Sequence, residues 1–167
     1  MTAQADLSSV APAIDVLADS PLWEREPNAV QTVERAIAAA AAEISAPPGE
    51  VAVMLTDDET IRTLNRDWRK IDKPTNVLSF PATRAPGAAA ALHGDIVIAY
   101  ETLAREASEE GKPFTHHLAH LAVHGFLHLM GYDHQNDSDA DAMERLESAI
   151  LKRLDVPNPY LARDLGA

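Results

Sequence analysis

The sequence contains no cysteine among its 167 residues. Disulfide bonds, thiolate nucleophiles, iron–sulfur clusters and cysteine-ligated zinc sites are therefore excluded. A chain without cysteine also fits the reducing cytosol.

Positive charge is scarce: 14 lysine and arginine residues face 26 aspartate and glutamate residues, which gives a net charge of −12. The broad basic footprint of many nucleic-acid-binding domains is absent from the chain as a whole. Any contact with nucleic acid must therefore use a local positive patch on an acidic body.

Long apolar runs are also missing. The longest near the amino terminus, residues 36–42, is mostly alanine and spans seven residues, whereas a membrane-spanning helix needs about 20. The first ten residues lack the basic start and apolar run of a signal peptide. We therefore expect a cytoplasmic protein that does not associate with membranes.

The composition, 46% apolar and 24% charged, is that of an ordinary globular protein. We expect a tail over residues 1–12 and one domain over residues 13–160. Apolar patterning and turn signals predict strands at about 14–18, 51–55, 77–80 and 94–98, and helices at about 29–44, 56–68, 99–110, 114–130 and 138–154. Strands interspersed with helices indicate an α/β or α+β domain around one small sheet.

Three of these helices begin beside residues that commonly cap a helix. Asn28 precedes the first long helix, Thr56 stands three residues before Glu59, and Ser138 stands three residues before Asp141. A hydroxyl followed by an acid at this spacing resembles a capping box, so we expect these residues to start their helices.

The clearest chemical signal is a group of three histidines. His124 and His128 stand four residues apart on a predicted helix and therefore share one face. Gly131 allows the chain to reverse after that helix, and His134 follows three residues later. The spacing matches the ligands of metzincin zinc proteases. Three imidazoles with one open position form a catalytic rather than a structural zinc site.

The residue after the first histidine departs from the protease pattern. Zinc proteases of this type place a glutamate there as general base, and this sequence has Gly125. Glycine cannot transfer a proton and weakens a helix, which suggests that a neighbouring group needs the space.

The flanking His116 and His117 are expected to face solvent without a metal role. His120, one turn before His124, is expected either to support the site or to pack.

The string HGFLHLMGYDH at residues 124–134 resembles the hallmark of the YbeY family of single-strand-specific endoribonucleases. Residues 64–69 (LNRDWR) with 74–81 (PTNVLSFP), and residues 94–98 (GDIVI), resemble two further blocks of that family. The resemblance covers about residues 50–150. Asn76 stands where many members have aspartate, which removes one acid from this position.

The resemblance implies an α+β domain with a small mixed four-stranded sheet and about five helices. It implies one Zn²⁺ ion held by His124, His128 and His134, and a catalytic role for Arg69. The implied function is endonucleolytic cleavage of single-stranded RNA in small-subunit ribosomal RNA maturation and ribosome quality control. The implied partners are ribosomal RNA and components of the small ribosomal subunit.

The residues themselves leave two alternatives open. A zinc hydrolase of peptides or small molecules would use a base from another element. A ribosome assembly factor would use its metal only to hold the fold.

The residues around the predicted site also have more than one interpretation. Arg69 precedes a short basic loop and can bind a phosphate with two hydrogen bonds, although a helix end favours cations in any case. Asp133 is expected either to orient a histidine or to form a turn, and Ser79 either to face the site or to pack. We expect Trp68 and Tyr132 to pack rather than to stack on bases.

Overall fold

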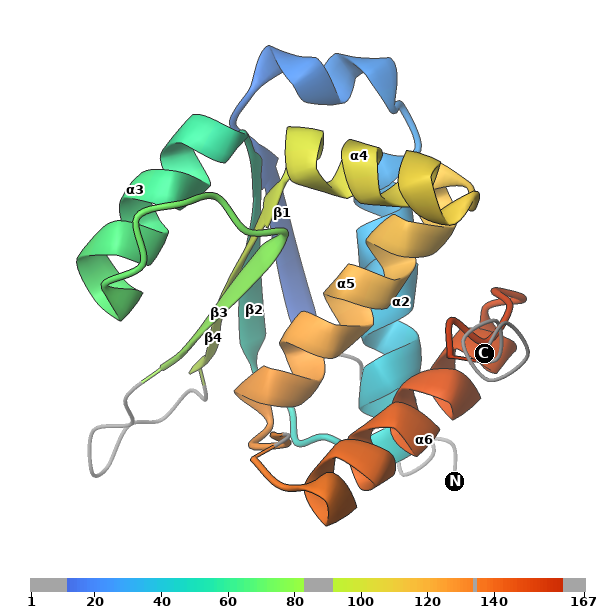
Figure 1. Cartoon of the computed structure of the whole chain (residues 1–167). Coiled ribbons are helices and arrows are strands. Elements are labelled where there is room, and N and C mark those ends of the chain that lie inside the picture. Colours follow the sequence, from blue (N-terminus) through green and yellow to red (C-terminus); the bar gives the residue numbers. More distant parts are fainter. Residues whose placement is uncertain (1–11, 83–91, 134, 161–167) are drawn as a thin grey trace.

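The computed structural model describes residues 12–82, 92–133 and 135–160 (Figure 1). Most of the predicted amino-terminal tail and the third predicted metal ligand, His134, lie outside these ranges. In the part that the structure describes, no helix is long and apolar enough to cross a membrane.

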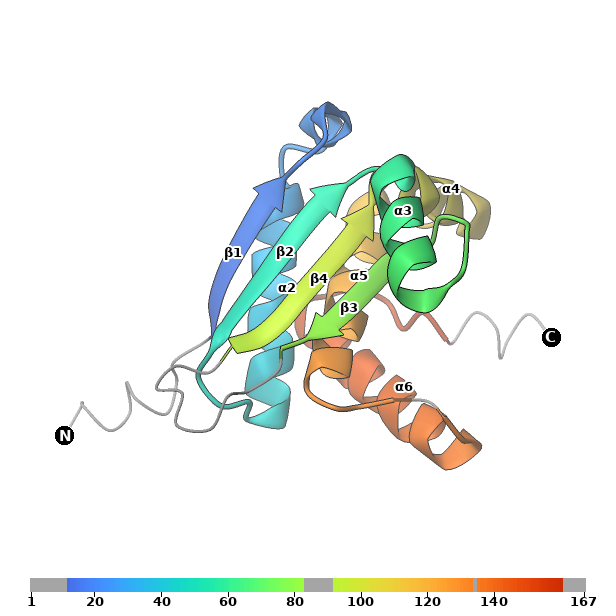
Figure 2. The same ribbon diagram turned by 90° about the vertical axis from the view of Figure 1, so that its left-hand side faces the viewer.

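Within the described ranges, a four-stranded mixed sheet forms the centre of the fold. Its strands are β1 (Ala13–Ala18), β2 (Glu50–Thr56), β3 (Val77–Pro81) and β4 (Leu92–Ala99), and their order across the sheet is β1-β2-β4-β3. β1, β2 and β4 run parallel, whereas β3 is antiparallel to β4 and forms one edge (Figure 2). The expected small mixed four-stranded sheet is confirmed.

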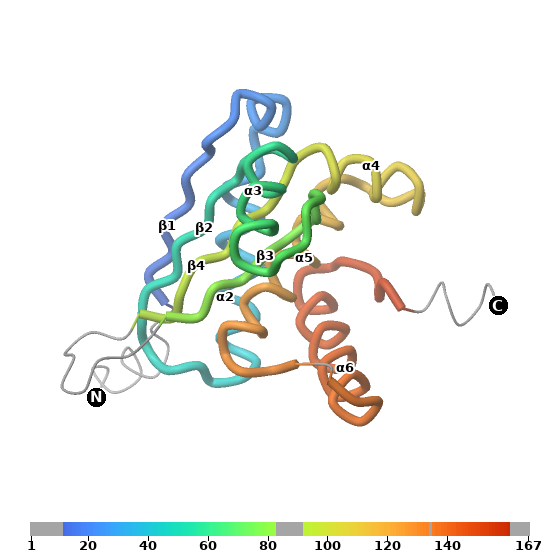
Figure 3. Tube along the Cα trace, turned by 60° about the vertical axis from the view of Figure 1, so that its left-hand side comes forward, coloured from blue at the N-terminus to red at the C-terminus, as the bar shows by residue number. Residues whose placement is uncertain are grey.

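Five α-helices and one 3₁₀ helix of the described residues surround the sheet. They are η1 (Pro21–Arg25), α2 (Ala29–Ile44), α3 (Asp58–Arg69), α4 (Tyr100–Glu110), α5 (Phe114–Leu129) and α6 (Asp137–Arg153). α2 and α5 lie on one face of the sheet and α3 on the other (Figures 1 and 2). α6 packs on α2 and α5, away from the sheet (Figure 3).

The main core lies between the sheet and the helix pair α2 and α5. Alanines of α2 allow close packing, and α5 buries apolar side chains around most of its circumference. A second, smaller core of Ile61, Leu78, Val97 and Ala99 lies under α3, on the opposite face. The two cores explain why the sheet is apolar on both faces at β4.

Two of the predicted helix caps are wrong by one or two residues. Asp57 rather than Thr56 caps α3, and its carboxylate accepts from the Thr60 amide at 2.9 Å. Asn136 rather than Ser138 caps α6. Thr56 is the buried last residue of β2, and its hydroxyl donates to the Asp19 carboxylate rather than to an amide of α3.

Asn28 does precede α2 as predicted, but it makes no side-chain cap hydrogen bond. Its backbone carbonyl instead accepts from the Thr32 amide and hydroxyl. The first helical amide, that of Ala29, donates to the Glu26 carbonyl, so the main chain satisfies one donor at the helix start.

Candidate metal centre

A row of histidines runs along α5. His117, His120, His124 and His128 follow one another at intervals of three or four residues, so the helix places them on one side. The centroids of successive rings lie 6.1, 6.4 and 4.6 Å apart. The closest pair is the one that the sequence predicts to bind metal.

His124 and His128 point the same nitrogen toward one place. Their Nε2 atoms lie 3.1 Å apart. Two nitrogens bound at 2.0–2.1 Å to one tetrahedral ion are about 3.4 Å apart. The pair therefore already has close to the spacing that a single zinc ion requires.

A buried carboxylate fixes the orientation of the first ring. Glu147 of α6 is 1% exposed, and its Oε2 accepts from His124 Nδ1 at 2.5 Å. Its Oε1 accepts from His120 Nε2 at 3.1 Å and from the Tyr160 hydroxyl. Because Nδ1 of His124 carries the donated proton, Nε2 keeps its lone pair directed at His128. A carboxylate behind a histidine ligand is the usual arrangement in zinc sites.

The environment of Glu147 keeps this carboxylate charged. Burial raises the pKa of the carboxyl, but hydrogen bonds from His120 and His124 and the attraction of both rings outweigh burial and lower its pKa to about 2. The group is therefore ionised at neutral pH, and it can accept the hydrogen bond from His124 Nδ1–H as a charged acceptor.

The third predicted ligand, His134, lies outside the described residues. Among the described residues alone, no three histidine, cysteine, aspartate or glutamate side chains are grouped so as to hold a metal. The chain turns after α5 as predicted: Gly131 has φ +96°, and the amide of Tyr132 donates to the Leu127 carbonyl. The paired nitrogens and their carboxylate support fit a zinc ion that has a further ligand beyond this turn.

The structure gives a reason for glycine at position 125. A Cβ there would lie 3.0 Å from Ile96 Cγ2 and 3.2 Å from Ser79 Oγ. The Ser79 hydroxyl also donates to the Gly125 carbonyl at 3.0 Å. α5 thus packs closely on β3 and β4 at this point, and the glutamate of the protease pattern does not fit.

Arg69 lies on a different face of the sheet from the histidines. It is the last residue of α3, it is exposed, and no hydrogen bond or ion pair joins it to another of the described side chains. The edge strand β3 separates α3 from α5 (Figure 2). A role for Arg69 at the metal requires a substrate that passes this strand.

Several neighbours differ from the sequence-based expectations. His117 is buried rather than solvent-facing, and it contacts Glu106 at 2.8 Å. Asn76 also donates to Glu106, at 2.9 Å. Tyr132 packs against the main core as expected, whereas the side chain of Trp68 is exposed.

Glu147 is the functional residue that the sequence analysis missed. The sequence does contain an indication of its position. Met143 precedes Glu147 by four residues, and Ile150 and Leu151 follow it by three and four, so the acid shares the buried face of α6 with these core residues. A charged side chain at such a position needs partners in the interior.

Comparison with known proteins identifies one family. The family model for endoribonuclease YbeY matches residues 21–155. A protein named endoribonuclease YbeY from Bradyrhizobium diazoefficiens is 57% identical over 159 residues, covering 91% of this chain and 87% of the relative. A protein of the same name from Rhodopseudomonas palustris is 56% identical and covers 95% of both chains.

A solution structure of a protein from Thermotoga maritima shares the fold. It superposes with a TM-score of 0.53 at 24% identity, over 85% of this chain and 91% of that chain. This similarity supports the α+β architecture.

Proposed function

The chain belongs to the YbeY family of endoribonucleases, and we propose on this basis that it is a zinc-dependent enzyme that cleaves single-stranded RNA. We further propose that its substrate is small-subunit ribosomal RNA during maturation and quality control in the cytoplasm. Components of the small ribosomal subunit are the proposed partners.

The observation that carries the proposal is the pair of imidazole nitrogens 3.1 Å apart, with Glu147 behind one of them. His124, His128 and His134 would hold the ion. A bound zinc ion supplies Lewis acidity toward a phosphoryl oxygen and lowers the pKa of a coordinated water to about 7.

The chain's own residues then have separate tasks. Glu147 orients His124 and fixes its tautomer. Arg69, the proposed catalytic residue, presents a planar guanidinium that can hold two oxygens of a phosphate in the strand that passes the edge of β3. Gly125 offers no carboxylate where zinc proteases have their base. This difference argues against peptide hydrolysis by the route that these zinc proteases use.

The first test replaces one ligand. In His124→Ala, zinc content measured by atomic absorption and cleavage of a single-stranded RNA should both fall to background. His116→Ala is the matched control, because this half-buried histidine lies on the same helix but outside the predicted ligand set. Unchanged cleavage by a zinc-free His124→Ala protein would refute the proposal.

The two alternative functions predict other outcomes. A peptide or small-molecule hydrolase would cleave such substrates better than RNA in side-by-side assays of protein free of host nucleases. A binding-only assembly factor with Arg69→Ala would still associate with ribosomes and complement a deletion strain. An enzyme that needs Arg69 for phosphate binding would fold normally and fail to complement.

A further inference from the structure

The most exposed large apolar side chain of the described residues is an indole. Trp68 is 70% exposed, compared with 60% for Leu17, 53% for Leu92 and 39% for Val30. Its ring meets Phe80 of β3 edge-to-face, with 6.0 Å between the centroids. One edge of the ring is therefore held against the sheet while most of its surface faces solvent.

This indole lies within the most basic stretch of an acidic protein. Residues 62–73 contain five cations and two aspartates, a net charge of +3 in a chain of −12. Ion pairs join Arg62 to Asp72 at 2.9 Å and Arg66 to Asp67 at 3.2 Å.

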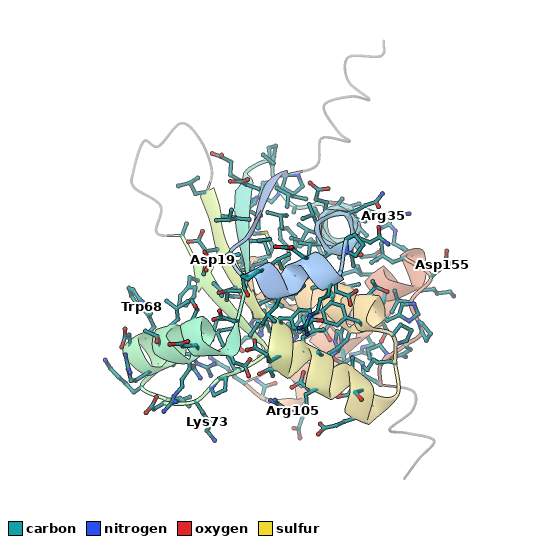
Figure 4. The ribbon with its side chains drawn as sticks, turned by 90° about the horizontal axis from the view of Figure 1, so that it is seen from above. Asp19, Arg35, Trp68, Lys73, Arg105 and Asp155 are labelled. Carbon is teal, nitrogen blue, oxygen red and sulfur yellow. The ribbon has the colours of Figure 1, made fainter. Side chains whose placement is uncertain are left out.

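Once these pairs are formed, the excess positive charge of residues 62–73 is that of Arg69, Lys70 and Lys73. All three are exposed, and they follow Trp68 within five residues. Figure 4 shows Trp68 and Lys73 on the α3 side of the molecule. An exposed aromatic ring is thus combined with a local positive charge.

The loop that carries the lysines is held in place. Lys70 has φ 64° and closes α3, with its amide donating to the Arg66 carbonyl. The buried Asn65 side chain donates to the Lys73 carbonyl at 2.9 Å. The backbone positions that carry the cations and the indole are therefore held relative to one another, which lowers the entropy cost of binding a ligand.

The edge strand β3 connects this surface with the histidines. Phe80 contacts Trp68 on one face of the sheet, and the adjacent Ser79 bonds to Gly125 of α5 on the other. Gly125 directly follows His124 in the sequence. The single strand β3 thus separates the indole surface from the helix that carries the predicted zinc ligands.

From this arrangement we propose that Trp68 is a base-stacking platform for single-stranded RNA, with Arg69, Lys70 and Lys73 contacting the adjoining phosphates. The inference rests on the proposed RNA substrate and adds the surface that holds it. The RNA strand passes from this platform over the edge of β3 to the predicted metal site. Stacking needs unpaired bases, so the platform selects single strands over duplexes.

The main test measures binding of a fluorescein-labelled eight-nucleotide oligouridine by anisotropy, with a denaturing gel to confirm that the RNA is intact. Trp68→Ala should weaken binding by roughly 5- to 150-fold, the range for loss of one aromatic stacking partner. Trp68→Phe should retain part of the affinity. Leu17→Ala is the matched control, because it removes an exposed apolar side chain from β1 at the far edge of the sheet.

Two further measurements separate stacking from charge. An abasic oligomer of equal length should bind wild type and Trp68→Ala alike, because it offers phosphates without bases. Three phosphate contacts predict a slope of about −2 for log K against log salt. Lys73→Ala should reduce the magnitude of that slope by about 0.7, whereas Trp68→Ala and the α6 control Lys152→Ala should leave it unchanged.

The outcomes distinguish the platform from the proposed function. If wild type cleaves and binds RNA but Trp68→Ala binds it equally well, the platform is wrong and the enzyme assignment stands. An equal loss of affinity for abasic RNA in Trp68→Ala would also overturn stacking. If wild type neither binds nor cleaves single-stranded RNA, both proposals fail.

Discussion

Glutamine at position 147 would keep the size of the side chain and remove its charge. In the protein, one carboxylate oxygen accepts from His124, and the other accepts from His120 and Tyr160. An amide offers only one accepting oxygen. In Glu147→Gln, the amide NH₂ group must therefore replace one of the two accepting oxygens. Either His124, or His120 together with Tyr160, then loses its hydrogen-bond acceptor.

The size of the effect follows from the burial of the group. A hydrogen bond to a charged partner contributes about 1.5–3 kcal/mol, and Glu147 is 1% exposed, so water does not replace the lost acceptor. Loss of the carboxylate behind a histidine ligand typically lowers metal affinity by about 10- to 100-fold. We expect zinc affinity in Glu147→Gln to fall within that range.

The assay is competition for zinc with a chromophoric chelator at fixed pH and ionic strength. Asp141→Asn is the control, because it removes an exposed carboxylate from the same helix. Circular dichroism establishes that both variants are folded, and Glu147→Asp tests whether a shortened but charged side chain restores part of the affinity. Wild-type zinc affinity in a folded Glu147→Gln protein would refute the claim that Glu147 orients His124.

Three further predictions concern packing, pH and charge. Gly125→Ala should lower the free energy of unfolding by up to about 2 kcal/mol in chemical denaturation, because its Cβ would lie 3.0 Å from Ile96 Cγ2 and an overpacking cost of about 1–3 kcal/mol exceeds the roughly 1 kcal/mol gained from alanine's helix propensity; a more stable variant would contradict the packing argument. Burial lowers the pKa of His117 despite its hydrogen bond to Glu106. The contribution of neutral His117 to the free energy of unfolding should therefore be complete above the pKa of about 6.5 that histidine has in the unfolded chain. It should be lost as the pH falls through the lower pKa of the folded state. His117→Gln should flatten that dependence, and an equally steep profile would count against His117 as its source. The charge of −12 should make naked precursor RNA a poor, salt-sensitive substrate compared with ribosomal particles; selective cleavage of naked RNA at physiological salt would argue against partner-assisted recognition.

Local patterning was sufficient to predict most of the fold. The helix over residues 29–44 was predicted with its observed bounds, because an alanine-rich run ends at Pro47 and Pro48. The caps were less predictable, since Thr56 and Asp57 are both suitable and the choice depends on where β2 ends. That end is determined by pairing with β4, a contact remote in sequence.

The site was predictable only in part for the same reason. The spacing of His124 and His128 reveals a shared helix face, and the structure brings their nitrogens together. Glu147 reaches His124 only because α6 packs on α5. The sequence predicts that Trp68 packs, as aromatic side chains usually do, whereas its ring meets Phe80 of the edge strand β3 and stays 70% exposed, an arrangement that depends on how α3 packs on the sheet.

The central claim is that the histidine site holds one zinc ion on which RNA cleavage depends. The most direct measurement removes metal from the purified protein, titrates zinc back, and records bound zinc and single-stranded RNA cleavage in the same samples. We predict that cleavage is absent without metal and rises in proportion to bound zinc until one ion is bound per chain. Full cleavage by the metal-free protein, or activity that does not follow zinc occupancy, would contradict the claim.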